Sequence, residues 1–370
     1  MAEAPPATEN TINITTPVSE NSSTKEEAPP TKSLEDVTHS IFKNGRYYNP
    51  WDTWEDPSFT KLLKWVATDR NKRNIPSQEE LDKTLPIKTV IYKDLKSLPP
   101  PGRVRVMWIG HASTLVQFDG VTLLTDPVFG DIVGPKGIIG RKRYRPCPVS
   151  VDDLPNIDAV FTSHNHFDHL DENTVRKLNE RFGESLRWFA PLGLKNWFCA
   201  TGCQNVVEMD WWDESCLENR PEILVACTPT QHWSRRSVGD FCKTLWGSWV
   251  IKGPSASYFF AGDTGYCTGF KEIGKRYGPF SLAAIPIGAY EPVWFKKPQH
   301  ISPEEAAQVH VDVRACKSIG IHWGTFPLGS EFYLDPPKEV RKGMEKLGQD
   351  PEDFLTLHHG EVKLLGTPSS

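Results

Sequence analysis

A short motif, HNHFDH at residues 164–169, constrains this chain more than any other feature of its sequence. It follows a mostly apolar run at residues 157–161, which is typical of a buried strand. In an extended segment, side chains two residues apart point the same way, so we expect His164, His166 and Asp168 to converge while His169 turns aside. This pattern suits two neighbouring metal ions better than one. Imidazole together with carboxylate suits zinc or a close relative such as iron or manganese.

Three further side chains with metal-binding chemistry also follow predicted strands. His232 comes after residues 223–227, Asp263 after residues 258–261, and His322 after residues 318–321. A strand end holds the backbone still while the loop beyond it leaves room for a substrate. A lone histidine at such a place is more often a satisfied core residue. Repeated histidine and aspartate at strand ends, with the HNHFDH motif among them, predicts a metal site.

The remaining pattern alternates strands and helices. Strands are expected at residues 104–109, 114–118, 121–125, 157–161, 223–227, 247–251, 258–261, 282–287 and 318–321. Helices are expected at residues 171–182, after the capping box that begins at Ser302, and along the apolar spacing of Phe59, Leu62, Leu63 and Val66. This order predicts a layered α/β domain, with sheets packed together and helices outside them.

The N-terminal region differs in composition from the rest. Residues 1–40 are dominated by Pro, Thr, Ser, Asn and Glu, and we expect a disordered tail there, followed by one hydrolase domain over residues 41–370. The tail lacks the basic start and apolar run of a signal peptide, and no stretch of 18 apolar residues follows. The eight cysteines show no CxxC pair, so we expect free buried thiols and a cytoplasmic protein.

Charge excludes one class of partner and suggests another. The net charge of −5 gives no general attraction to nucleic acid, so no nucleic-acid partner is expected. Residues 136–145 nevertheless hold five cations around Ile138 and Ile139, which favours either a solvated loop or a surface for anionic head groups. Trp51, Trp54 and Trp65 leave a membrane-facing role open for the segment before the first large strand.

The motif and its partners resemble those of the metallo-β-lactamase superfamily. That resemblance implies an αββα sandwich of two mixed sheets flanked by helices, with two zinc ions per chain at one edge. It assigns the first ion to His164, His166 and His232, the second ion to Asp168, His169 and His322, and the bridging position to Asp263. His111 looks like a loop residue of the family rather than a ligand. Asp126 matches an acid that accepts a ligand's free N–H.

A narrower resemblance covers residues 44–365. Segments such as TSHNHFDHLD, FFAGDTGYC, AAIPIGAYEP and IHWGTF are similar to those of the N-acylphosphatidylethanolamine-hydrolysing phospholipase D family. The family cleaves a membrane phospholipid to phosphatidic acid and an N-acylethanolamine. The resemblance therefore implies a zinc-dependent phosphodiesterase that works as a homodimer, bound peripherally to the cytosolic face of intracellular membranes.

The same resemblance implies substrate contacts. His300 matches a substrate-contacting histidine, Gln299 stands beside it, and Arg235 falls where the family places a basic residue near a bile-acid site. Catalysis would involve His300, with Asp168 and Asp263 positioning metal rather than attacking phosphorus. Two positions depart from the vertebrate pattern: Phe167 replaces a substrate-contacting Tyr, and Gly239 replaces a Met at the bile-acid site.

Three other functions compete with this interpretation. A nuclease of the same superfamily would need basic grooves and usually an inserted domain, which the charge and the single predicted domain argue against. A soluble lactonase or small phosphoester hydrolase is a closer competitor, because the metal site alone does not distinguish it. A non-catalytic lipid-binding protein on this fold would not require a complete set of seven ligands.

Overall fold

The computed structural model describes Met1 and residues 37–366, except for residues 57 and 69–74. The described residues from Val37 onward belong to one compact unit. The predicted tail boundary at residue 40 stays a prediction, because residues 2–36 lie outside the described part. Within that part, no helix is both long enough and apolar enough to cross a membrane.

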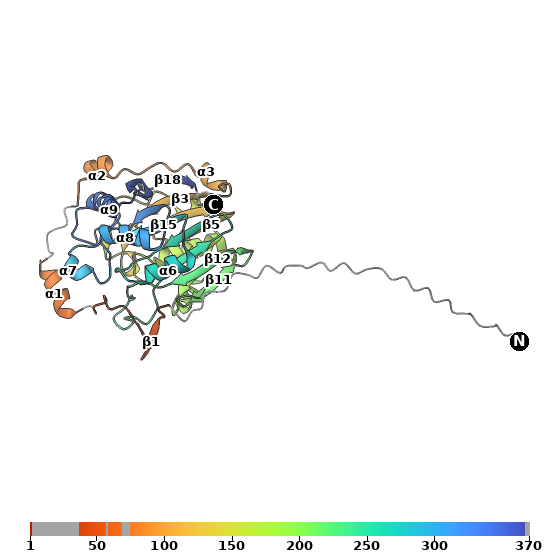
Figure 1. The fold of residues 1–370 in the computed structure, drawn as a ribbon, viewed down its shortest axis with the longest axis horizontal. Helices are drawn as coiled ribbons and strands as arrows, with labels where there is room; N and C mark the ends of the chain where they lie inside the picture. The colour runs from red at the N-terminus through yellow and green to blue at the C-terminus, as the bar shows by residue number, and fades with distance from the viewer. Residues whose placement is uncertain (2–36, 57, 69–74, 367–370) are drawn as a thin grey trace, which may run out of the picture. The chain divides into compact units, whose positions relative to one another are not determined.

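Two seven-stranded mixed sheets form the centre of the fold (Figure 1). The first has the order β10-β9-β8-β5-β4-β3-β18, and the second has the order β11-β12-β13-β14-β15-β16-β17. The strands of the first sheet are β3 (Arg103–Gly110), β4 (Ser113–Phe118), β5 (Val121–Thr125), β8 (Ala159–Phe161), β9 (Arg187–Pro191), β10 (Val206–Met209) and β18 (Val362–Gly366). Those of the second are β11 (Glu214–Leu217), β12 (Arg220–Thr228), β13 (Ser248–Lys252), β14 (Ser257–Phe260), β15 (Leu282–Pro286), β16 (Ser318–Ile321) and β17 (Phe354–Leu355).

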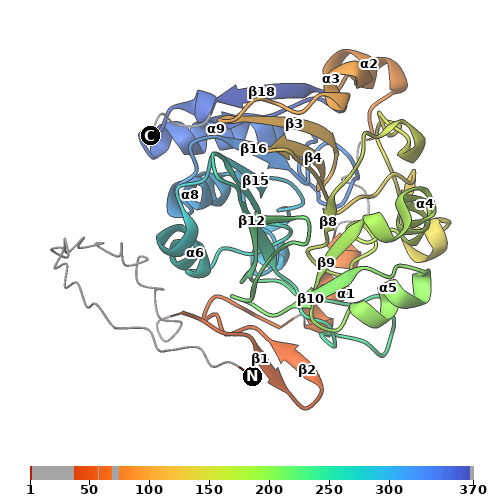
Figure 2. The same cartoon turned by 90° about the vertical axis from the view of Figure 1, so that its right-hand side faces the viewer.

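Helices cover the outer faces of both sheets. In Figure 2, α4 and α5 lie outside the first sheet, whereas α6, α8 and α9 lie outside the second. Two short hairpins, β1–β2 (Ile41–Lys43 and Arg46–Tyr48) and β6–β7 (Ile132–Val133 and Arg141–Lys142), complete the strands. The helices are α1 (Phe59–Thr68), α2 (Gln78–Thr84), α3 (Tyr92–Lys96), α4 (Glu172–Phe182), α5 (Lys195–Thr201), α6 (Gly269–Tyr277), α7 (Val293–Lys296), α8 (Pro303–Asp312) and α9 (Asp335–Lys346). The predicted αββα sandwich of two mixed sheets is confirmed.

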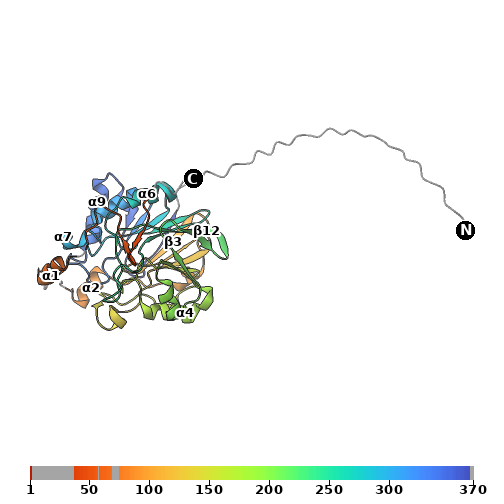
Figure 3. The same cartoon turned by 90° about the horizontal axis from the view of Figure 1, so that it is seen from below.

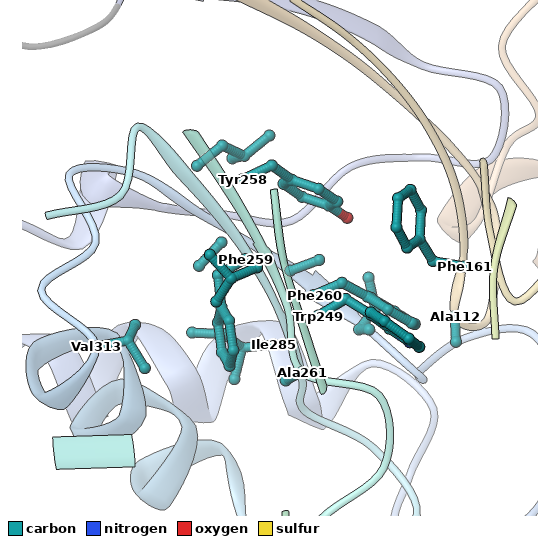
Figure 4. Close-up of a cluster of buried hydrophobic side chains, with 14 of the residues drawn as sticks. Ala112, Phe161, Trp249, Tyr258, Phe259, Phe260, Ala261, Ile285 and Val313 are labelled. Atoms are coloured by element: carbon teal, nitrogen blue, oxygen red, sulfur yellow. The ribbon is translucent and has the colours of Figure 1, made fainter. Parts of the chain in front are cut away.

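The core lies where the two sheets face each other, and further apolar side chains pack where each sheet meets its helices. Figure 4 shows Tyr258 on the side that faces Phe161 of the first sheet, whereas Phe259 and Ile285 point toward Val313. Successive strand side chains alternate between faces, and both faces of β14 are covered. After Ser257 this strand is therefore aromatic at every position, without the polar alternation of a half-exposed strand.

Local signals predicted two of the helices well. Asp171 caps α4 by accepting the Thr174 backbone N–H, and Gly183 ends the helix. Ser302 and Glu305 form the expected capping box at the start of α8. Helix α1 covers the predicted apolar spacing, and Leu63 is half exposed; the side chains of Phe59, Leu62 and Val66 lie outside the described set.

The structure decides against the membrane-facing role left open for Trp51, and it corrects the interpretation of residues 136–145 as five exposed cations. Trp51 is buried and donates its indole N–H to the Thr230 carbonyl, so it belongs to the core rather than to a membrane-facing surface. Arg143 and Arg145 are also buried: Arg143 binds the Val128 and Ile109 carbonyls, and Arg145 pairs with Asp82. Residues 136–145 therefore do not present five cations to solvent, because two of them stabilise the interior.

The cysteines agree with the prediction only in part. All eight are free, but four of them are buried (Cys203, Cys227, Cys242 and Cys267), and Cys199 is exposed.

Candidate metal centre

Polar side chains follow the carboxyl ends of six strands, three in each sheet, and meet at one edge of the sandwich. In the first sheet β3, β5 and β8 share a direction, and in the second sheet β12, β14 and β16 do. Their carboxyl ends are followed by His111, Asp126, His164, His232, Asp263 and His322. His111, Asp126 and His322 adopt positive φ, a backbone conformation that non-glycine residues rarely take and that accumulates at functional sites.

Three histidines form the first cluster. The Nε2 atom of His164 lies 2.7 Å from Nδ1 of His166, which in turn lies 3.2 Å from Nε2 of His232. Tetrahedral zinc with bonds of about 2.1 Å would hold such nitrogens about 3.4 Å apart, so the cluster needs little adjustment to bind one ion. The fold therefore brings together the three residues that were expected to bind the first ion.

The second cluster contains His169, His322, Asp168 and Asp263. Nε2 of His169 lies 3.2 Å from Oδ2 of Asp263, and Nε2 of His322 lies 3.0 Å from Oδ1 of the same carboxylate. Oδ2 of Asp168 lies 3.5 Å and 3.6 Å from those two nitrogens. Because Oδ2 of Asp263 is also 3.9 Å from Nε2 of His232, this carboxylate stands between the two clusters, where a bridging ligand would be.

Neighbouring groups fix which nitrogen each histidine presents. His169 donates Nδ1–H to Asp126 (2.6 Å), and His232 donates Nδ1–H to the Gln299 carbonyl (3.0 Å). His164 donates Nδ1–H to the Ser163 hydroxyl, which donates to Asp126. Each of the three therefore directs an Nε2 lone pair into the site, as second-layer partners of metal-bound histidines do.

Burial and charge give the two clusters different protonation. Burial lowers the pKa of His166 to about 4 and that of His232 to about 3, so both rings are neutral near pH 7. Burial alone would also lower the pKa of His322, but Asp263 and Asp168 reverse this and raise it to about 9. Burial would raise the pKa of Asp263, yet His169 and His322 hold it well below its usual value. A cation entering the second cluster would therefore displace protons from histidine.

A second, independent observation also indicates that these side chains can bind metal. Nε2 of His169, Nε2 of His322 and Oδ1 of Asp263 are buried but make no hydrogen bond among the described residues, although they crowd together. Buried polar atoms without hydrogen bonds are costly unless something else satisfies them. A pair of cations between the clusters would do so.

A cleft of about 320 Å³ opens onto the clusters. The residues that line it at the metal centre are His166, Asp168, Asp263 and His300. It is also lined by Phe167, Trp233 and Gln299. Its rim includes Trp65 of α1, Lys296 of α7, and Val133, Gly134 and Arg141 of the β6–β7 hairpin. In Figure 3, α1 and α7 lie side by side, and their Trp65 and Phe295 rings stack with centroids 5.2 Å apart.

The four predicted substrate contacts differ in how the structure places them. His300 lies with Nδ1 3.7 Å from Oδ2 of Asp263, so it faces the centre directly. Gln299 lines the cleft, but its side-chain oxygen accepts the Trp233 indole N–H. Phe167 also lines the cleft, under the guanidinium of Arg236 at 4.3 Å. Arg235 is exposed, bonds to the Ser237 carbonyl, and is not among the residues that line this cleft.

His111 belongs to the site in a way that the sequence did not indicate. Its Nε2 lies 2.9 Å from Oδ2 of Asp168, and its ring centroid lies 4.0 Å from that of His322. The only sequence signal was its place after a strand, because the partners lie 57 and 211 residues away along the chain. Ser163 was also missed, although it directly precedes His164 and connects that ring to Asp126.

Comparison with known proteins agrees with this geometry. Residues 122–323 match the family model described as beta-lactamase superfamily domain. The chain is 40% identical over 333 residues to N-acyl-phosphatidylethanolamine-hydrolyzing phospholipase D 1 of Caenorhabditis elegans, covering 87% of this chain and 92% of that protein. It is 36% identical over 237 residues to the mitochondrial enzyme of the same name from Saccharomyces cerevisiae, covering 63% of this chain and half of that protein.

Solved structures share the fold at low identity. A metallo hydrolase from Ignicoccus hospitalis, Igni18, matches with a TM-score of 0.55 and 22% identity, covering 72% of this chain and 100% of that one. An isothiocyanate hydrolase from Delia radicum gut bacteria has the same TM-score at 19% identity, covering 70% and 98%. The long alignment with the nematode enzyme and the superfamily match together show that this chain belongs to the N-acylphosphatidylethanolamine-hydrolysing phospholipase D family of metallo-β-lactamase-fold hydrolases.

Proposed function

We propose that this chain hydrolyses N-acylphosphatidylethanolamine to phosphatidic acid and N-acylethanolamine, using two zinc ions. The observation that carries the proposal is the cleft at the double cluster, whose rim combines Lys296 and Arg141 with the aromatic Trp65. A phospholipid presents the same combination of an anionic phosphodiester and apolar chains. The relationship to enzymes named for this substrate supports the same choice.

The metal ligands divide into two sets and a shared residue. His164, His166 and His232 would hold one ion, Asp168, His169 and His322 the other, and Asp263 both. Bound zinc supplies Lewis acidity and lowers the pKa of water from 15.7 to about 7. Asp168 and Asp263 hold metal in this scheme and do not themselves attack phosphorus.

Other residues bind and orient the lipid. Lys296 and Arg141 place positive charge at the mouth of the cleft, where a phosphodiester would enter. His300 points an unbonded, buried Nδ1 into the site, at the right place to contact the phosphate or to assist the departing ethanolamine oxygen. Phe167 and Trp233 supply apolar walls that exclude bulk water from the phosphate.

The test is product analysis on vesicles that contain N-acylphosphatidylethanolamine. Mass spectrometry should find phosphatidic acid and N-acylethanolamine, and in oxygen-18 water the label should enter phosphatidic acid because water attacks phosphorus. Label in the N-acylethanolamine would contradict attack at phosphorus. Absence of turnover on this lipid, with hydrolysis of a lactone or a small phosphodiester, would replace the proposed substrate.

We also propose peripheral membrane binding through the same side of the molecule, and we place it on the cytosolic face of intracellular membranes by the family resemblance alone. Ile138 and Ile139, at the tip of the β6–β7 hairpin, are 72% and 75% exposed, and the hairpin lines the cleft through Gly134 and Arg141. Exposed isoleucines beside a cation would insert into the apolar layer while the charge meets the head groups. Here the isoleucines, rather than Arg143 and Arg145, carry the contact.

Vesicle sedimentation tests this docking surface. Ile138→Ser with Ile139→Ser should weaken binding, whereas Ile91→Ser with Leu98→Ser removes exposed apolar side chains beside α3, which do not line the cleft, and should not. Equal binding by both double variants would refute docking through the hairpin.

Homodimerisation and bile-acid binding are proposed on the family relationship. Arg235 and Gly239 are both exposed, so a ligand in solution has access to them. Light scattering tests the dimer, and calorimetric titration with deoxycholate tests the bile-acid site, for which Arg235→Ala should reduce binding.

A further inference from the structure

The segment Asn49–Thr53 lies against the loop that carries His232. Asn49 donates its side-chain N–H to the His232 carbonyl at 2.8 Å, and Thr53 donates its hydroxyl to the side-chain oxygen of Gln231 at 2.6 Å. Trp51, between them, donates to the Thr230 carbonyl at 3.2 Å. Three alternate residues of one segment thus bind three consecutive residues of the other. We call residues 49–53 the strap.

Tryptophan packing holds the strap in place. The Thr230 carbonyl accepts a second indole N–H, from Trp246 at 3.1 Å, and Trp211 donates to the Trp246 carbonyl. Trp51 is buried over Gly269, where an added Cβ would lie 2.8 Å from the indole ring. The buried Trp51 therefore anchors the strap to the interior, while the half-buried Asn49 and the exposed Thr53 bind the loop from the surface.

Gln231 connects the strap to the rest of the centre. It is buried, its side-chain nitrogen donates to the Pro298 carbonyl at 2.9 Å, and its backbone N–H donates to the Thr264 hydroxyl. The next residue after Pro298 is Gln299, whose carbonyl accepts Nδ1–H of His232. A displacement of Gln231 would therefore reach both the backbone and the ring of His232, and also the loop that carries His300.

We infer that Asn49 and Thr53 are positioning residues for the metal centre: Asn49 fixes the backbone of His232, and Thr53 fixes its loop through Gln231. The Gln299 carbonyl accepts Nδ1–H of the His232 ring, and Asn49 binds the backbone carbonyl of the same residue. Together these two contacts fix the direction of Nε2. This inference rests on the proposed metal site. It adds support for the metal centre from the strap, which lies more than 170 residues from His232 and Gln231 in sequence.

The test is metal affinity, measured on metal-free full-length protein by competition with a chromophoric zinc chelator. Asn49→Ala should weaken zinc binding about tenfold, at the lower end of the range for residues behind metal ligands, because it acts on a backbone and not on a ring. Thr53→Val should weaken it similarly, and Thr53→Ser, which keeps the hydroxyl, should restore it. Cobalt(II) in place of zinc should give a visible spectrum altered in Asn49→Ala and Thr53→Val only.

Two control variants match the chemistry that is removed. Asn179→Ala deletes an amide that binds a main-chain carbonyl, that of Gly202, far from the cleft. Thr38→Val deletes a hydroxyl near the start of the same N-terminal segment, where it binds Glu272. Both should keep wild-type zinc affinity even if they lower the melting temperature.

The outcomes separate this inference from the proposed site. If the unmodified chain binds no zinc, the metal site itself is refuted, and the positioning role with it. If it binds zinc, and Asn49→Ala and Thr53→Val lower only the melting temperature while affinity and cobalt spectrum stay unchanged, the strap is merely structural. A spectrum altered equally by Thr38→Val would also overturn the assignment, because general loosening would then explain the effect.

Discussion

Asp126→Asn should weaken metal binding more than any other change that leaves all ligands in place. The Asp126 carboxylate accepts the Ser163 backbone N–H at 2.7 Å, the Ser163 hydroxyl at 2.5 Å and the His169 Nδ1–H at 2.6 Å. Asparagine keeps the shape but offers one oxygen, so the Ser163 hydroxyl and the His169 ring would face an N–H. Each buried donor left unpaired costs about 1–3 kcal/mol, which gives a destabilisation of about 2–6 kcal/mol. The His169 ring also loses its orientation, so affinity for the second ion should fall about 10–100-fold.

The assay combines chelator competition with urea denaturation of the metal-free protein. Asp119→Asn is the matched control, since Asp119 likewise accepts three hydrogen bonds, from the Ser255 and Ala256 backbone N–H groups and the Ser255 hydroxyl, but far from the centre. It should lower stability without changing zinc affinity. If Asp126→Asn retained two ions at wild-type affinity, the role assigned to the hydrogen bond between Asp126 and His169 would be refuted.

Three further outcomes are expected. The purified chain should hold close to two zinc equivalents, and elemental analysis that shows one ion in a fully active preparation would contradict a site for two ions. Asp263→Asn should abolish activity and reduce the metal content, because the two cations lose their shared anion. His300→Ala should lower kcat while both metals stay bound, whereas a structural role would lower the melting temperature and spare kcat. Metal-free protein should lose stability as the pH falls from 6.5 to 4, because the unfolded chain takes up protons that burial keeps off His166 and His232 in the folded state. For His166 alone the loss is about 3 kcal/mol, and urea denaturation across that range would measure it.

The sequence predicted those parts of the fold that local chemistry determines. The capping box at Ser302 and the helix expected over residues 171–182 depend mainly on neighbouring residues, so both appear close to their predicted places. The strand expected at residues 157–161 shortens to Ala159–Phe161, because its neighbour β9 begins only at Arg187, which pairs with Ala159. The candidate ligands could be predicted since each follows a strand, and the sandwich collects strand ends at one edge.

Contacts between residues far apart in the chain could not be predicted from the sequence. A run of cations looks the same whether its members are solvated or buried, and the carbonyls of Val128 and Ile109 that bind Arg143 in the interior are not adjacent to it in sequence. Trp51 was open to a membrane role because nothing near it in sequence reveals Trp211, Trp246 and Gly269. His111 was set aside for the same reason, since its contact with Asp168 depends on how two loops meet.

The candidate metal ligands are spread unevenly along the chain, and their order has a consequence for protein synthesis. The segment after β8 supplies His164, His166, Asp168 and His169, whereas His232, Asp263 and His322 follow strands of the second sheet. The first sheet is itself closed by β18, which pairs with β3 from the opposite end of the described chain. A nascent chain that has folded its first strands thus exposes four ligands with no partners to complete either ion's coordination. Selective loading of metal must wait until the ribosome has released nearly the whole domain, so a truncated product should be inert rather than partly active.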